Sequence, residues 1–197
     1  MPPDPTGDDI LGLAIRVGKA LDAVGARYML VGSVASSLQG DPRTTNDVDF
    51  VTALRTAQVE RFSTALGEDF DVDQQALSDA MASGGSWNIF YSPWMSKIDL
   101  FALGGSEFHR TQLSRSIKMA IGADRLTILR ADDLVLSKLL WYRDGGGVSE
   151  QQWRDVLGVL RVSAKTIDFE YLREWAARLG IQTLLEKALG EVGRRAP

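Results

Sequence analysis

The pattern of apolar residues changes once along the chain, near Arg130, and this change limits the fold more than any other feature. Before it, strand-like segments, in which apolar and polar residues alternate or form short apolar runs, are interspersed with segments of helical period. The strand-like segments are residues 27–31, 47–52, 69–73, 87–91, 97–102, 117–121 and 125–129. After Arg130 only helical period remains. The sequence therefore predicts a mixed α/β unit over residues 1–130, followed by a helical unit over residues 131–197.

Few residue types are available for chemistry. The chain of 197 residues has no cysteine and one histidine, His109, which excludes disulfides, zinc fingers, thiol nucleophiles and multi-histidine metal sites. Carboxylates remain, and they suit hard cations such as magnesium or manganese. The net charge of −4 argues against a protein that coats nucleic acid non-specifically.

The ends of the chain and its hydropathy bear on where the protein resides. The sequence has no apolar run of about 18 residues that would span a membrane. Met1–Pro5 lacks the basic and then apolar profile of a signal peptide. We therefore expect a soluble, cytoplasmic protein with no membrane partner. Residues 1–7 are rich in proline, and we expect them to form a loose tail.

Charge is unevenly spread over the second half of the predicted α/β unit. Between Ser106 and Arg130 there are five basic residues against two acidic ones. We interpret this basic stretch as the solvated face of two strands. Contact with a phosphate backbone is the alternative.

Paired carboxylates provide the first candidate site. Asp47 and Asp49 alternate with apolar residues in a strand-like segment, so both side chains would face the same side. Two such charges repel each other unless a cation lies between them. The run from Asp69 to Asp73 is a rival, but it lacks the glycine and the glutamate of a calcium loop. We interpret that run as the acidic edge of a half-buried strand.

Residues on either side of the pair add to this site. Upstream, a buried strand ends at Gly32-Ser33, where a helix begins, and a helix N-terminus offers free N–H groups to a phosphate. An ordinary helix start is the alternative for these two residues. Arg43 and Thr45 precede the pair, and their guanidinium and hydroxyl groups are of the kind that binds a polyanion. Downstream, Asp99 is isolated among apolar residues and needs a partner, for which a shared metal ion is one candidate. Three carboxylates in this order are typical of two-metal phosphoryl-transfer sites.

These motifs resemble the nucleotidyltransferase superfamily that shares its core with DNA polymerase β. The matching residues are Val31-Gly32-Ser33, Asp47-Val48-Asp49-Phe50 and Lys97-Ile98-Asp99-Leu100. The stretch RTTNDVDFV, which begins at Arg43, is similar to the Arg-x-Thr-x-Asp-x-Asp signature of the abortive-infection type nucleotidyltransferase toxins and their uncharacterised bacterial relatives. Residues 129–156 resemble the segment in which that group carries a lysine, an arginine and a later basic residue followed by aspartate, here Lys138, Arg143 and Arg154-Asp155. The resemblance covers about Tyr28 to Leu189.

The resemblance implies a fold, an activity and a set of roles. The fold would be α+β, with a nucleotidyltransferase-type mixed β-sheet flanked by helices and a C-terminal helical unit that completes the cleft. The activity would be magnesium-dependent transfer of a nucleoside monophosphate from a nucleoside triphosphate (NTP) such as ATP. Asp47, Asp49 and Asp99 would be catalytic and would hold Mg²⁺ or Mn²⁺. The residues that bind the nucleotide would be Gly32, Ser33, Arg43, Thr45, Lys138 and Arg143. Asp155 would either contact these residues without touching the nucleotide or face the substrate.

Two of these residues have alternatives in the sequence itself. Lys138 lies at the edge of an apolar helix stripe, where it would present its ammonium to the nucleotide. The alternative is a surface lysine paired with Asp133 or Asp144. Asp155 has no charged residue four positions away on its helix, so it needs a more distant partner.

The acceptor is open at this point. The leading expectation is a hydroxyl of RNA, tRNA included, or of a protein. By the same resemblance the chain would be the toxin of a toxin–antitoxin system, with an antitoxin protein as partner. One alternative is an antibiotic-type nucleotidyltransferase with a small acceptor, which an acidic acceptor pocket would favour, whereas the basic stretch favours RNA. The other is a nucleotide-binding module without turnover.

Overall fold

The structure, a computed structural model, describes residues 9–195 and divides into two compact units. The first unit runs up to Val34 and from Thr44 to Leu129, and the second comprises Ala35–Arg43 and the described chain from Arg130 onward. The predicted domains, 1–130 and 131–197, assign Ala35–Arg43 to the sheet, whereas this segment packs with the C-terminal helices. The predicted loose tail, residues 1–7, lies outside the described residues.

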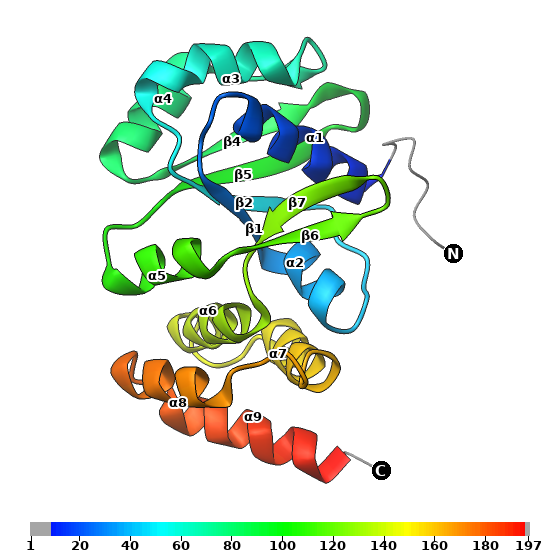
Figure 1. Cartoon of the computed structure of the whole chain (residues 1–197), viewed down its shortest axis with the longest axis vertical. Helices are drawn as coiled ribbons and strands as arrows, with labels where there is room; N and C mark the ends of the chain where they lie inside the picture. The colour runs from blue at the N-terminus through cyan, green and yellow to red at the C-terminus, as the bar shows by residue number, and fades with distance from the viewer. Residues whose placement is uncertain (1–8, 196–197) are drawn as a thin grey trace. The chain divides into compact units, whose positions relative to one another are not determined.

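The first unit is built on a mixed sheet of seven strands (Figure 1). The strands are β1 (Tyr28–Val31), β2 (Val48–Thr52), β3 (Phe70–Asp71), β4 (Ser86–Tyr91), β5 (Ser96–Ala102), β6 (Ile117–Ile121) and β7 (Asp124–Ile128). Their order is β3-β4-β5-β2-β1-β7-β6. The pairs β2/β5 and β1/β7 are parallel, and the other neighbours are antiparallel. The predicted α+β fold with a mixed sheet flanked by helices is confirmed.

Three helices cover one face of this sheet (Figure 1): α1 (Ile10–Ala23), α3 (Val59–Leu66) and α4 (Gln74–Ser83). Helix α1 packs on β1, β2 and β7, α4 packs on β4 and β5, and α3 contacts both helices. Val48 and Phe50 of β2 and Ile98 and Leu100 of β5 are fully buried in this core. Because side chains alternate along a strand, the residues between them face the opposite side of the sheet.

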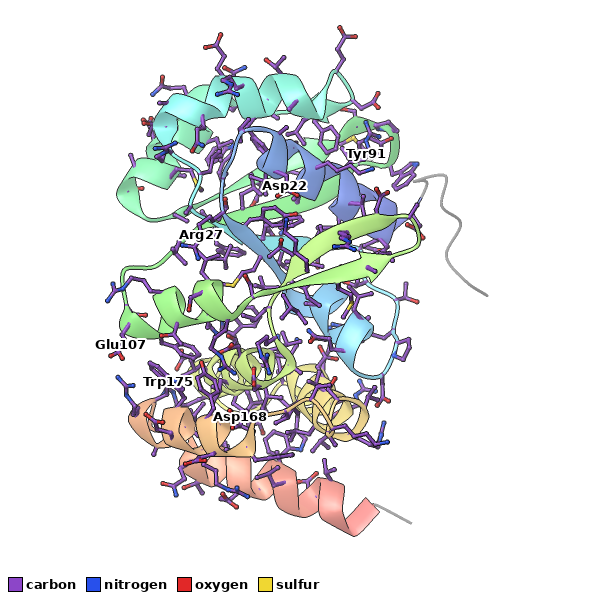
Figure 2. The ribbon with its side chains drawn as sticks, in the orientation of Figure 1. Asp22, Arg27, Tyr91, Glu107, Asp168 and Trp175 are labelled. Atoms are coloured by element: carbon purple, nitrogen blue, oxygen red, sulfur yellow. The ribbon has the colours of Figure 1, made fainter. Side chains whose placement is uncertain are left out.

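The acidic run from Asp69 to Asp73 contributes to this packing. Arg16 of α1 donates hydrogen bonds to the Asp69 carboxylate and to the hydroxyl of Tyr91, which is labelled in Figure 2, both at 2.9 Å. Asp73 caps α4 by accepting a hydrogen bond from the backbone N–H of Ala76 at 2.9 Å. The strand predicted over 69–73 shortens to Phe70–Asp71. Two of its three aspartates therefore have structural roles.

Helix α5 (Glu107–Arg115) was not predicted from the sequence, because the basic stretch from Ser106 was interpreted as part of two strands. Ser106 caps this helix by accepting a hydrogen bond from the backbone N–H of His109 at 3.1 Å. Only Phe108, Gln112 and Leu113 are buried, so the apolar pattern is too sparse to show helical period. The two predicted strands of the stretch, β6 and β7, are present and pair antiparallel as a hairpin.

The second unit is helical, as the sequence predicts. It contains α6 (Ala131–Asp144), α7 (Glu150–Val162), α8 (Phe169–Arg178) and α9 (Gln182–Arg195). Helix α6 packs on α7 and α8, and α9 packs on the same two helices. Ser149 caps α7 by accepting a hydrogen bond from the backbone N–H of Gln152 at 3.3 Å. In the part of the chain that the structure describes, no helix is long and apolar enough to cross a membrane.

The end of α2 (Gly32–Gln39) and the residues that follow it up to Arg43 pack with α7 in the second unit. The Ser163 hydroxyl, at the end of α7, donates a hydrogen bond of 2.6 Å to the backbone oxygen of Gln39. A Cβ atom on Gly158 would lie 3.0 Å from the backbone nitrogen of Asp41, so a glycine in α7 permits this close approach. The start of α2 belongs to the first unit, and residues 35–43 belong to the second.

Candidate active site

Two of the three predicted catalytic carboxylates meet on neighbouring strands. The parallel pairing of β2 and β5 places Asp49 directly opposite Asp99. Both residues are half-buried, and both alternate with core residues, so they share the sheet face that is turned away from α1 and α4. Asp47 is exposed and immediately precedes β2. The structure therefore places Asp49 and Asp99 on one sheet face, whereas Asp47, for which the sequence predicts the same side as Asp49, lies before the strand begins.

Lys97 joins this cluster and was not predicted as a site residue. Its Nζ lies 2.8 Å from Oδ2 of Asp99. This hydrogen bond raises the pKa of Lys97, burial lowers it, and the charges of Asp99, Asp47 and Asp49 raise it further. All three carboxylates are thus within electrostatic reach of one ammonium group. The partner that Asp99 was expected to need is, in this structure, Lys97.

Gly32 makes room for the Asp49 carboxylate. Val31 pairs with Asp49 across β1 and β2, and Gly32 follows it with a φ of 65°. A Cβ atom at Gly32 would lie 2.0 Å from Oδ2 of Asp49, so a side chain at this position would displace the carboxylate. Ser33 is half-buried in the first turn of α2, at the predicted helix start. The Gly32-Ser33 turn and the Asp49 carboxylate therefore lie against each other.

Asn88 is a second residue that the sequence did not single out. The antiparallel pairing of β4 and β5 places it opposite Asp99, so Asn88, Asp99 and Asp49 form a row across three strands. Phe90 and Phe101 flank this row on the same face, with 37% and 36% of their surfaces exposed. The apolar residues Ile89 and Tyr91, both buried, alternate with Asn88 and Phe90, and this alternation is a sequence signal for the face on which Asn88 lies but not for its neighbours.

Three candidate residues of the second unit, Arg43, Lys138 and Asp155, form another cluster. Nζ of Lys138 donates to Oδ2 of Asp155 at 2.8 Å and to Oε1 of Gln152 at 3.0 Å. Arg43 donates to both oxygens of Asp155, from Nε at 3.0 Å and from Nη2 at 3.2 Å. Asp155 therefore has the distant partners that the sequence requires.

Lys138 differs in its setting from both sequence interpretations. Only 1% of its surface is exposed, whereas the pattern put it at the edge of an apolar stripe. It forms an ion pair with Asp155, which neither interpretation included. Arg143 has other partners. It forms an ion pair with Asp144 at 2.8 Å and donates a hydrogen bond of 2.8 Å to the backbone oxygen of Leu179.

The carboxylates of the first unit fit a metal ion that is held together with a substrate. Among residues 9–195, no three histidine, cysteine, aspartate or glutamate side chains are placed to hold one metal ion. Mg²⁺ is, however, usually bound by one or two carboxylates plus substrate phosphates, not by a cage made of protein alone. Asp49 supplies one such carboxylate next to Gly32, and Asp47, two residues before it, offers a second. The donor set therefore suits a hard divalent cation that is bound with a phosphate.

Comparison with solved structures finds the antibiotic-resistance factor ANT(2'')-Ia in two structures. Its solution structure has a TM-score of 0.50 and 8% identity, over 91% of this chain and 92% of that chain. Its crystal structure in complex with adenylyl-2''-tobramycin has a TM-score of 0.51 and 8% identity, over 85% of this chain and 94% of that chain. An antigenic nucleotidyltransferase-like protein from Paracoccidioides brasiliensis has a TM-score of 0.49 and 15% identity, over 90% of each chain.

No protein-family model and no curated protein sequence matches the chain. At 8% identity, the likeness to ANT(2'')-Ia is a likeness of fold. The fold of this chain is that of the nucleotidyltransferases.

Proposed function

We propose that this protein is a nucleotidyltransferase that moves a nucleoside monophosphate from an NTP to a hydroxyl acceptor. The observation that carries the proposal is the placement of Asp49, opposite Asp99 and against Gly32. It joins two carboxylates to the start of a helix, where backbone N–H groups suit a phosphate. Phosphoryl transfer needs a phosphate site and carboxylates at the same point.

In this proposal, the Gly32-Ser33 turn binds the β and γ phosphates, and Asp47 and Asp49 hold the divalent cation, Mg²⁺ or Mn²⁺. Asp99, opposite Asp49, would complete a second cation site in the two-metal arrangement that the sequence resemblance implies. When bound, the cation neutralises charge on the phosphate oxygens and so stabilises the transition state. Glycine at position 32 keeps the turn close to the Asp49 carboxylate.

The acceptor reacts beside Asp99. Its hydroxyl oxygen forms a bond to the α-phosphorus, and the bond from this phosphorus to the bridging oxygen breaks. Pyrophosphate leaves with the electron pair, and the Asp99 carboxylate takes the proton of the hydroxyl. Lys97 holds Asp99 in place through the 2.8 Å contact between Nζ and Oδ2. In-line displacement of this kind depends on positioning more than on covalent chemistry.

Further nucleotide contacts are proposed for four residues. Thr45 precedes the Asp47–Asp49 pair and donates its hydroxyl within this turn, to the backbone oxygen of Asp47. Arg43, Lys138 and Arg143 carry positive charge that suits a triphosphate. Support for Arg43 and Lys138 comes from the sequence resemblance, and 26% of the Arg43 side chain is exposed. Support for Arg143 comes from the sequence resemblance and from its partial exposure.

The leading acceptor is a hydroxyl of RNA or of a protein, and we extend the proposal to the toxin of a toxin–antitoxin pair that an antitoxin protein would bind. The sequence resemblance supports both. Lys118 and Arg125 are exposed on the β6–β7 hairpin, which favours RNA over a cationic acceptor. A small antibiotic acceptor is the second candidate, since ANT(2'')-Ia, solved with adenylyl-2''-tobramycin, shares the fold.

Label transfer tests the proposal. The protein is incubated with Mg²⁺ and each of the four α-³²P-labelled ribonucleoside triphosphates, in separate reactions with total RNA, with a protein extract and with tobramycin. Transfer to RNA or protein supports the leading acceptor, and transfer to tobramycin supports the second candidate. Labelled NTP that binds and is never transferred identifies a nucleotide-binding module without turnover.

A further inference from the structure

The row of side chains across the sheet has two different ends. It runs from β1, where Gly32 lies against Asp49, through Asp49 on β2 and Asp99 on β5 to Asn88 on β4. Under the proposed function, the phosphates bind at the β1 end. In an in-line displacement the attacking and leaving oxygens lie on opposite sides of the phosphorus. The pyrophosphate therefore leaves toward β1, and the acceptor approaches Asp99 from the side of β4.

The side chains that β4 presents on this face are uncharged. Ser86, Asn88 and Phe90 lie on the same face as Asp99, because Asn88 is its cross-strand partner and side chains alternate along the strand. Asn88 is exposed, and its amide can both donate and accept hydrogen bonds. The next carboxylate in this direction is Asp71, opposite Phe90 on the edge strand β3. An amide and an aromatic ring, with no cation-binding group between them, thus border Asp99.

Two exposed rings lie on opposite sides of the Asn88–Asp99 pair. Phe90 is two residues beyond Asn88 on β4, and Phe101 is two residues beyond Asp99 on the antiparallel strand β5. Their exposed fractions are 37% and 36%. About four residues of strand, or roughly 13 Å, separate the two rings, which is too far for both to enclose one small ring. Two separate stacking surfaces suit a chain with successive bases, such as single-stranded RNA.

We infer that Asn88 and Phe90 bind the base of the RNA nucleoside whose ribose hydroxyl is the acceptor. The inference rests on the proposed function and selects single-stranded RNA among its acceptors. Phe90 stacks on the base, and the Asn88 amide forms hydrogen bonds with its edge, which are the two contacts that proteins use for unpaired bases. The ribose hydroxyl then faces Asp99, and Phe101 offers a stacking surface to another base of the same strand.

Trp87 provides a matched control. It belongs to the same strand as Phe90, and 37% of its surface is exposed, as in Phe90. It pairs with Leu100, which is buried in the core, so it lies on the other face of the sheet. Trp87→Leu and Phe90→Leu therefore both remove an exposed ring from β4, and only Phe90→Leu removes it from the face of Asp99.

The test measures kcat/KM for transfer from labelled NTP to RNA. Nuclease digestion of RNA labelled by the parent identifies the accepting nucleoside, and a short RNA of that sequence is synthesised with this base and without it. The parent should use the abasic RNA about tenfold less well or worse, because stacking is lost. Phe90→Leu and Asn88→Ala should lower kcat/KM on the intact RNA by a similar factor and should match the parent on the abasic RNA. Trp87→Leu should match the parent on both.

An equal loss on the two RNAs in Phe90→Leu and in Asn88→Ala would overturn the inference, and so would unchanged activity on the intact RNA. Equilibrium dialysis of labelled NTP should give the parent's affinity in all three variants, and weaker NTP binding in Phe90→Leu would place the ring at the nucleotide instead. Either variant decides the test if a thermal melt shows that the other is unfolded. A parent that labels only protein or tobramycin overturns this inference and leaves the proposed function. A parent that transfers to none of these acceptors overturns both.

Discussion

Asp49 on β2 lies directly opposite Asp99 on the parallel strand β5. Neighbouring strands are about 4.8 Å apart, so two like charges in register on one face repel each other. The ammonium of Lys97 offsets this repulsion through its contact with Asp99. This arrangement distinguishes the cluster from the other acidic run of the chain, in which Asp69 is paired with Arg16 and Asp73 caps a helix.

Gly32→Ala should reduce nucleotidyl transfer strongly. The added Cβ would lie 2.0 Å from Oδ2 of Asp49 and would displace this carboxylate. Gly25→Ala is the matched control, because Gly25 has a similar φ of 69° and nothing within 4 Å of an added Cβ. Both variants should lose about 1–2 kcal/mol of unfolding free energy to backbone strain. Denaturant unfolding together with a transfer assay checks this, and equal activity in the two variants would show that the contact with Asp49 is unimportant.

Metal binding should depend on the nucleotide. Asp47 and Asp49 are two carboxylates without a complete protein cage in residues 9–195, so Mn²⁺ alone should bind weakly. An NTP that is bound at the Gly32-Ser33 turn should tighten Mn²⁺ binding at least about tenfold, because phosphate oxygens add ligands. Electron paramagnetic resonance of free Mn²⁺ measures this. Asp47→Asn should abolish the increase, and tight Mn²⁺ binding without nucleotide would contradict the proposed donor set.

Acid should destabilise the protein through His109. Burial lowers the pKa of His109 below the ordinary value of 6.5. As the pH falls through about 6.5, the unfolded chain takes up this proton before the folded chain does, so the free energy of unfolding decreases. The chain has one histidine, so its ring titration is resolved by proton NMR. The pKa should be below 6.5, and His109→Gln should remove this part of the loss between pH 7 and pH 5.5; a pKa at or above 6.5 would refute the prediction.

Local pattern predicts the candidate carboxylates but not their pairing. Alternation along residues 47–52 and 97–102 predicts that Asp49 and Asp99 lie on the sheet face that points away from the core. The structure has this orientation. Which strands become neighbours depends on the whole sheet, in which β5 inserts beside β2 although two helices and two strands separate them along the chain. Asn88 enters the row only through this order. The sequence alone could not identify it.

The second cluster shows the same limit. The sequence indicates that Asp155 needs a distant partner, because no charge lies one helical turn away. Its partner Arg43 is 112 residues distant and belongs to a segment that was assigned to the sheet unit. Lys138 is buried rather than at the edge of its helix stripe, because Asp155 and Gln152 accept its hydrogen bonds. Ion pairs between residues so far apart in the chain produce no periodic pattern in the sequence, so this pairing could not be predicted from it.

The most direct test of the central claim is nucleotidyl transfer by Asp49→Asn, compared with Asp71→Asn from the rival acidic run. Both substitutions remove one aspartate charge from a strand of the same sheet. The transfer rate is measured with α-³²P-labelled NTP, Mg²⁺ and the acceptor that the parent uses. Asp49→Asn should be slower by about a thousandfold or more, or about 4 kcal/mol of transition-state stabilisation, and Asp71→Asn should match the parent. Transfer by Asp49→Asn at the parent's rate would contradict the assignment of this cluster as the active site.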